Sequence, residues 1–192
     1  MNKNRLEAFS DGVIAIIITI MVLEIKMPND TSLDSIKSVL PSLGSYLLSF
    51  VFIAIYWGNH HHLLHTLQKV NGKVLWANLH LLFWLSLIPV GTAWMANTNY
   101  DSVAVAIYGA LLVACGMAYS ILGSIIGKTA KESELTKAFE KMRVKGMLSS
   151  ILYISSIPLA FVNPYISCAI FASVGLMWVI PNKDVERILG EE

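Results

Sequence analysis

Six long apolar segments, separated by short polar stretches, organise this chain. Within each segment the hydrophobic residues run almost continuously instead of alternating with polar ones, which indicates membrane helices rather than membrane β-strands. Only helices and closed barrels satisfy their backbone hydrogen bonds in lipid. We therefore predict an all-α membrane protein, with residues 1–192 forming one domain of six transmembrane helices at about 5–25, 41–64, 74–97, 103–126, 146–161 and 164–180.

The composition agrees with an integral membrane protein. The chain is 55% hydrophobic and 14% charged, whereas soluble domains are about 25% charged. Its net charge is +1, and no basic cluster with interleaved aromatic residues indicates a nucleic-acid partner. The sequence carries no nucleophile elbow, glycine-rich phosphate loop or paired-carboxylate motif, so we do not expect an enzyme.

The distribution of lysine and arginine predicts how the helices cross the membrane. If the N-terminus is cytoplasmic, twelve of these residues lie inside and two, Lys26 and Lys37, lie outside. This asymmetry follows the positive-inside rule, so we expect both termini in the cytoplasm. The charged stretch from Lys128 to Lys145 would then be the longest inner loop, and its charge spacing predicts a solvated amphipathic turn.

The first predicted helix begins with polar residues, including Asp11 at membrane depth. A charged side chain there costs about 2.5–3.5 kcal/mol on insertion scales and indicates a functional or paired group. The aliphatic run from Gly12 to Leu23 is only about 18 Å long at the helical rise of about 1.5 Å per residue, against about 30 Å for the hydrocarbon core. We therefore expect this helix to sit inside an assembly.

A helical wheel separates two faces of the first helix. Asp11, Ile18 and Val22 lie on one side, and an aliphatic stripe with Thr19 at its edge lies on the other; the stripe consists of Phe9, Val13, Ile16, Ile20 and Leu23. Ordinary packing is one interpretation of the stripe. The other is a narrow hydrophobic pore enclosed by several subunits, since no remaining helix carries a polar stripe and hydrophobic constrictions can gate by dewetting.

Asp11 needs a partner from a neighbouring helix, because Arg5 lies six positions away on another face. Polar residues at the same inner end of the second and third helices are candidates: Asn59, His60, His61, His62, Asn78 and His80. We expect Ser10, Asp11 and one or more of these histidines to form a structural hydrogen-bonded network. Histidine titrates near neutral pH, so a proton-linked transporter or a proton-permeable channel using Asp11 and the histidine cluster is an alternative function.

His61 and His65 also have the i, i+4 spacing of metal ligands on a helix. Carboxylates are scarce around them, and oxygen-activating membrane iron sites need several histidine boxes where this chain has one. We expect no metal and no resident cofactor, and a membrane metalloenzyme remains a weaker alternative.

The motif Arg5-x-x-x-Phe9-Ser10-Asp11-Gly12, together with Trp57-x-x-His60-His61 closing the second helix, resembles the signature of the transmembrane protein 175 family. The resemblance covers the whole chain. It implies a potassium-over-sodium selective cation channel, like the single-repeat prokaryotic members, in which a homotetramer surrounds a pore lined by helix 1. The location implied is the prokaryotic plasma membrane, and the implied partners are potassium ions, the lipid bilayer and other copies of the chain.

The resemblance also assigns roles to residues. The pore constriction would fall at Ile16, with Ile20 and Leu23 as further layers and Thr19 at a position implicated in selectivity. An interhelical network that fixes the pore helix would contain Arg5, Phe9, Ser10, Asp11, His60, His61, Asn78 and His80. Several layers are isoleucine where relatives use leucine or valine, which leaves the pore width open.

Overall fold

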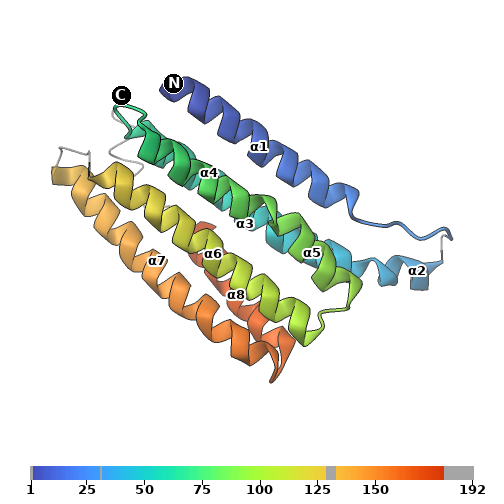
Figure 1. Ribbon diagram of the computed structural model, residues 1–192. Coiled ribbons are helices and arrows are strands. Elements are labelled where there is room, and N and C mark those ends of the chain that lie inside the picture. Colours follow the sequence, from blue (N-terminus) through green and yellow to red (C-terminus); the bar gives the residue numbers. More distant parts are fainter. Residues whose placement is uncertain (1, 31, 129–132, 180–192) are drawn as a thin grey trace.

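The structure, a computed structural model, describes residues 2–30, 32–128 and 133–179, with residues 133–142 described by their backbone only. These residues form eight α-helices, which are labelled in Figure 1. The helices are α1 (Lys3–Leu23), α2 (Leu33–Ser38), α3 (Leu40–His65), α4 (Gly72–Ser86), α5 (Ile88–Asn97), α6 (Ser102–Gly127), α7 (Ser133–Ala160) and α8 (Pro164–Val179). All regular elements among the described residues are α-helices, so the all-α prediction is confirmed. Because α2 leads directly into α3 and α4 into α5, the eight helices form six helical segments.

Four of these segments are long and apolar enough to cross a membrane: Lys3–Leu23, Leu33–His65, Gly72–Asn97 and Ser102–Gly127. The first of them is long enough to span although its aliphatic run alone is short. Its backbone stays helical through the polar residues that precede the aliphatic run, so its 21 residues extend about 31 Å at 1.5 Å per residue.

The expected third helix, residues 74–97, is divided in two. α4 ends at Ser86 and α5 begins at Ile88, with Pro89 in the first turn of α5. Proline lacks the backbone N–H that would continue the helical hydrogen-bond ladder, and its ring collides with the carbonyl four residues earlier. The axis therefore breaks at Leu87 and resumes at once.

The expected inner loop from Lys128 to Lys145 is mostly helical, which corrects the prediction of a loop with a single turn. α7 already begins at Ser133 and runs to Ala160 without interruption. The charge spacing that suggested one turn therefore belongs to the first turns of a long helix. Residues 129–132 lie outside the described residues.

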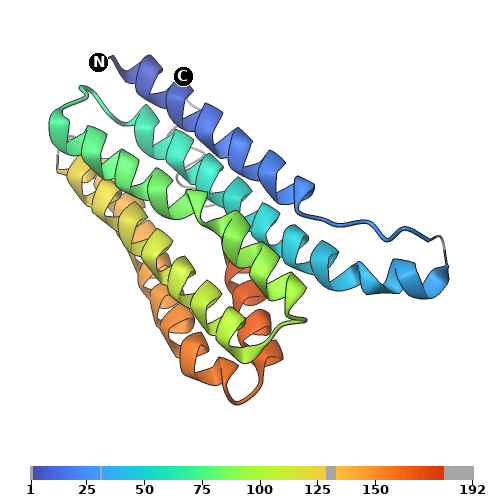
Figure 2. The same cartoon turned by 45° about the vertical axis from the view of Figure 1, so that its right-hand side comes forward.

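The helices pack as an elongated bundle with α1 at one edge. In both views α1 runs along the outside, and α7 lies on the far side beyond α6 (Figures 1 and 2). α1 contacts α3, α4 and α5, whereas α8 packs between α3, α6 and α7. Helix 1 is therefore held from one side by the rest of the chain.

Buried hydroxyls join three helices where α5 begins. The Ser49 hydroxyl oxygen lies 2.6 Å from that of Thr92 and 2.8 Å from that of Tyr108. The Tyr108 ring in turn meets Phe171 of α8 edge to face, with ring centroids 5.5 Å apart. These contacts satisfy the buried hydroxyls and hold α3, α5, α6 and α8 together, and α1 packs on two of these helices, α3 and α5.

Candidate functional site

The two sides of α1 differ sharply in burial. Its buried residues repeat at helical spacing and face α3, α4 and α5: Leu6, Ser10, Ile14, Ile17 and Met21. The aliphatic stripe lies largely outside this face: its side chains are exposed by 53% at Phe9, 58% at Ile16, 43% at Ile20 and 79% at Leu23, whereas Val13 is half-buried and packs against the core. Full burial of each such side chain is worth about 1.5–3 kcal/mol. On a membrane span, either lipid or another protein surface can cover this stripe.

Thr19 is exposed beside this stripe. Its hydroxyl donates to the Ile16 carbonyl oxygen of its own helix at 2.8 Å. Because the hydroxyl proton is used in that bond, Thr19 Oγ1 can still accept a hydrogen bond or coordinate a cation through its lone pairs.

A buried hydrogen-bonded chain ties α1 to α4 and α3. The Asn78 side-chain amide donates from Nδ2 to Ser10 Oγ at 2.9 Å, and its Oδ1 lies 2.6 Å from His60 Nε2. Ser10 Oγ in turn donates to the Leu6 carbonyl oxygen at 2.9 Å. Since Asn78 Oδ1 can only accept, His60 Nε2 carries the proton in this arrangement. The structure thus brings together Ser10, His60 and Asn78, all fully buried.

Three further contacts join α1 to α3 at successive turns. Lys3 Nζ donates to the His65 carbonyl oxygen at 2.8 Å, and Glu7 Oε1 lies 2.8 Å from His61 Nδ1. The indole N–H of Trp57 donates to Asp11 Oδ1 at 2.9 Å. These three contacts, here named the α1–α3 ladder, advance four residues along α1 and retreat four along α3, as antiparallel helices in register require.

Other residues expected in the interhelical network lie elsewhere in the subunit. Arg5 is exposed, and its backbone N–H donates to the N-capping Asn2 side chain at 2.9 Å. Phe9 lies in the exposed stripe, and His80 accepts a hydrogen bond from the Trp84 indole on its own helix at 2.9 Å. Within one subunit the structure therefore does not bring Arg5, Phe9 or His80 to Asp11.

The structure adds two residues that the sequence reasoning did not assign. They are Trp57, which binds Asp11, and Glu7, which lies against His61. Glu7 and Asp11 are four residues apart on α1, and Trp57 and His61 are four residues apart on α3. This equal spacing is the sequence signal that matches Glu7 to His61 and Asp11 to Trp57 once the two helices are set antiparallel.

The histidine cluster shows ring contacts rather than a ligand set. The His61 ring lies 5.7 Å from that of His62 and 6.4 Å from that of His65, measured between centroids. Across the described residues, no group of three or more His, Cys, Asp or Glu side chains is arranged to hold a metal ion.

Comparison with known proteins places these contacts in a family context. A family model described as endosomal/lysosomal potassium channel TMEM175 matches residues 5–89, which include most of α1 and all of α2, α3 and α4. A potassium channel from Chryseobacterium sp. (strain P1-3) is 47% identical over 191 residues, covering 100% of both chains. A potassium channel from Streptomyces collinus is 30% identical over 93% of this chain and 92% of its own length.

A solved structure shares the fold. The crystal structure of a lysosomal potassium-selective channel TMEM175 homolog from Chamaesiphon minutus has a TM-score of 0.81 and 26% sequence identity, covering 93% of this chain and 96% of that chain. The bundle described above is thus similar over nearly its whole length to that channel.

Proposed function

Because this chain belongs to the TMEM175 family of potassium channels, we propose that four copies of it enclose a pore lined by α1, through which potassium crosses the membrane in preference to sodium. The observation that carries this proposal is the exposed aliphatic stripe on a helix whose other side is fixed by hydrogen bonds. Packing around a common axis would cover the stripe and give it a function at the same time.

The stripe suits a hydrophobic constriction. Rings of Ile16, Ile20 and Leu23 from four subunits would form successive narrow layers, with Ile16 as the narrowest. An ion crosses such layers only by shedding part of its hydration shell, and potassium holds its water less strongly than the smaller sodium ion. The Thr19 hydroxyl oxygens, with their lone pairs free, would replace some of the lost water.

The orientation we propose follows from charge. Both termini lie in the cytoplasm, and the protein resides in the prokaryotic plasma membrane. Arg5 and Phe9, exposed on the single subunit, would face neighbouring copies and contribute to the interhelical network across the subunit boundary. Ion conduction involves no covalent chemistry, so we propose neither an enzymatic activity nor a resident cofactor.

Potassium flux from liposomes containing the purified tetramer tests this proposal. We expect Ile16→Asn to wet the constriction and to reduce the preference for potassium over sodium. Val22→Asn is the matched control, because Val22 is 47% exposed on the same helix but lies away from the stripe. Unchanged selectivity in Ile16→Asn, or an equal change in Val22→Asn, would contradict a pore lined by the stripe.

The same flux assay distinguishes this channel from the alternative function. The alternative is a proton-linked transporter or proton-permeable channel that uses Asp11 and the histidines. The hydrogen bonds favour a structural role, because an asparagine amide stands between Ser10 and His60 and an indole N–H binds Asp11. Neither an amide nor an indole readily passes a proton on. Saturable, proton-gradient-coupled flux would favour the alternative, whereas non-saturating potassium flux in a fixed proton gradient favours the channel.

A further inference from the structure

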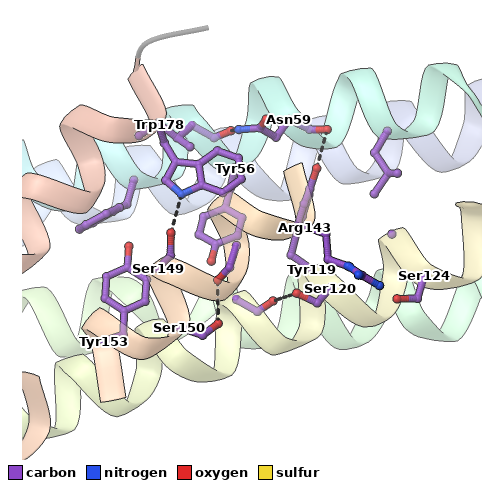
Figure 3. A pocket seen from close by; sticks show the side chains of 16 residues that line it. Tyr56, Asn59, Tyr119, Ser120, Ser124, Arg143, Ser149, Ser150, Tyr153 and Trp178 are labelled. Atoms are coloured by element: carbon purple, nitrogen blue, oxygen red, sulfur yellow. Dashed lines mark hydrogen bonds between the residues drawn. The ribbon is translucent and has the colours of Figure 1, made fainter. Parts of the chain in front are cut away.

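A pocket of about 390 Å³ lies away from α1, between α3, α6, α7 and α8. Its volume is within the range of about 300–1,000 Å³ that is typical of small-ligand sites. Figure 3 shows its lining side chains, with the Trp178 indole bound to Ser149 at one side and Arg143 beside Ser120 and Ser124 at the other. None of these residues belongs to the pore helix or to its hydrogen-bonded contacts.

The pocket has the length of one membrane leaflet. Its lining extends from Phe52 to Leu63 on α3 and from Arg143 to Tyr153 on α7, in each case about 15 Å at 1.5 Å per residue. The hydrocarbon core of a bilayer is about 30 Å thick. The pocket therefore extends about half-way across, starting close to the end of α3 at His65 and about three turns after the start of α7 at Ser133.

Positive charge marks the polar end of the pocket. Arg143 lines it with an exposed side chain that forms no hydrogen bond or ion pair within the described part of the chain. Two residues further along α7, Lys145, which does not line the pocket, places its Nζ 5.2 Å from the Trp178 ring centroid, and the Trp178 indole N–H donates to Ser149 Oγ at 2.8 Å. Among the described residues, Arg143 is thus the one cation that lines the pocket, and its guanidinium is a group that an anionic headgroup would bind.

The rest of the wall behaves as apolar surface although it contains several serines. Ser120, Ser149 and Ser150 each donate to the carbonyl oxygen four residues earlier on their own helix, at 2.9 Å. The Tyr56 and Tyr153 hydroxyls form no hydrogen bond within the described residues, and they are the donors that ester carbonyls in the pocket would find. Asn59 and Tyr119, which also line the pocket, donate to the carbonyl oxygens of Ile55 and Asn59 at 2.8 Å and 3.1 Å, respectively. Apart from Ser124, the remaining lining is mainly hydrocarbon and aromatic ring.

From this arrangement we infer that the pocket binds an anionic phospholipid of the leaflet at which α7 begins, with its phosphate at Arg143 and an acyl chain along the wall between α3, α6 and α7. A soluble phosphate would use the arginine but leave the long apolar wall uncovered. The inference requires that the chain be embedded in a membrane, but not that it conduct ions.

Native mass spectrometry of the full-length purified protein, titrated with phosphatidylglycerol or phosphatidylcholine, tests the site. Arg143→Gln should weaken phosphatidylglycerol binding about tenfold, the loss expected for one charge-assisted contact, while Arg143→Lys should retain most of it. Gly123→Leu should block the pocket without a clash, because a Cβ at Gly123 meets no atom within 4 Å. Phosphatidylcholine should bind more weakly than phosphatidylglycerol.

Two matched controls separate the pocket from general effects. Lys128→Gln removes an exposed cation that follows α6 at the same end of the bundle, and Gly127→Leu adds the same bulk on α6 outside the pocket. Both should bind phosphatidylglycerol like the original chain. Equal weakening in Lys128→Gln, unchanged binding in Arg143→Gln or Gly123→Leu, or displacement of the lipid by millimolar glycerol 3-phosphate would overturn the inference. Because no ion flux is measured, a negative result here leaves the channel proposal standing.

Discussion

Glu7 and His61 form the middle contact of the α1–α3 ladder, with Glu7 Oε1 2.8 Å from His61 Nδ1. Lys3 meets the His65 carbonyl one turn before it, and Asp11 meets the Trp57 indole one turn after it. The ladder fixes how far α1 is shifted along α3, and the exposed aliphatic stripe begins within it, at Phe9. The polar third of α1 therefore sets the depth at which the apolar remainder lies.

The Glu7–His61 contact itself should add little stability. Its side chains are 22% and 50% exposed, respectively, and such surface pairs are typically worth about 0–1 kcal/mol. We expect Glu7→Gln to lower the free energy of unfolding by less than about 1 kcal/mol, as measured by thermal unfolding in detergent. A loss several times larger would assign this pair a buried, charge-dependent role.

The buried Asn78 contacts should matter more. Asn78→Leu preserves the side-chain volume but leaves the His60 Nε2 proton and one Ser10 lone pair without partners. A buried unsatisfied group costs about 1–3 kcal/mol, so this variant should unfold at a clearly lower temperature than Glu7→Gln. Asn97→Leu, at the exposed end of α5, is the control and should change stability little; equal effects of both variants would contradict the structural role.

Asp11 should serve assembly more than conduction. Its carboxylate is half-buried and held by Trp57, so Asp11→Ala should reduce the yield of tetramer in size-exclusion chromatography more than it changes the conductance of the channels that form. Trp57→Phe should have the same effect, and combining the two should add little, since both remove one bond. Normal tetramer yield with altered conductance would move Asp11 into the pore.

Thr19 should tune selectivity without affecting folding. Thr19→Val keeps the shape and removes the oxygen whose lone pairs are free, so potassium-over-sodium preference should fall while thermal stability stays nearly constant. Thr98→Val removes a hydroxyl that likewise donates to a carbonyl of its own helix, at 2.8 Å, but lies outside α1. Selectivity that is preserved in Thr19→Val, or lost equally in Thr98→Val, would count against the proposed role.

Continuous hydrophobicity was enough to predict helices, because lipid excludes other backbone structures. It was not enough to place the break at Pro89 or the start of α7. The hydropathy averaged over a membrane-length window does not show an interruption of one residue, such as the one between α4 and α5. Charged residues at helical spacing occur both in loops and in helices that extend out of the bilayer, so they did not reveal the start of α7.

The two faces of α1 were easier to predict from the sequence than the hydrogen-bond partners of its polar residues. A helical wheel placed Asp11 away from the stripe from angles alone, but a wheel has no register between helices. It therefore could not choose Trp57 over the neighbouring histidines as the partner of Asp11. The matching four-residue steps at Lys3, Glu7 and Asp11 carried that register, and they acquire meaning only when α1 and α3 are set antiparallel.

Thiol modification at the stripe tests directly whether α1 lines the pore. Potassium flux would be recorded from liposomes containing Leu23→Cys or Val22→Cys before and after a water-soluble cationic thiol reagent, with the original chain as control for Cys115 and Cys168. Both positions are exposed on the single subunit, but only Leu23 belongs to the stripe. The account predicts that the reagent blocks flux through Leu23→Cys and spares Val22→Cys. Unblocked flux through modified Leu23→Cys, or block of Val22→Cys alone, would contradict it.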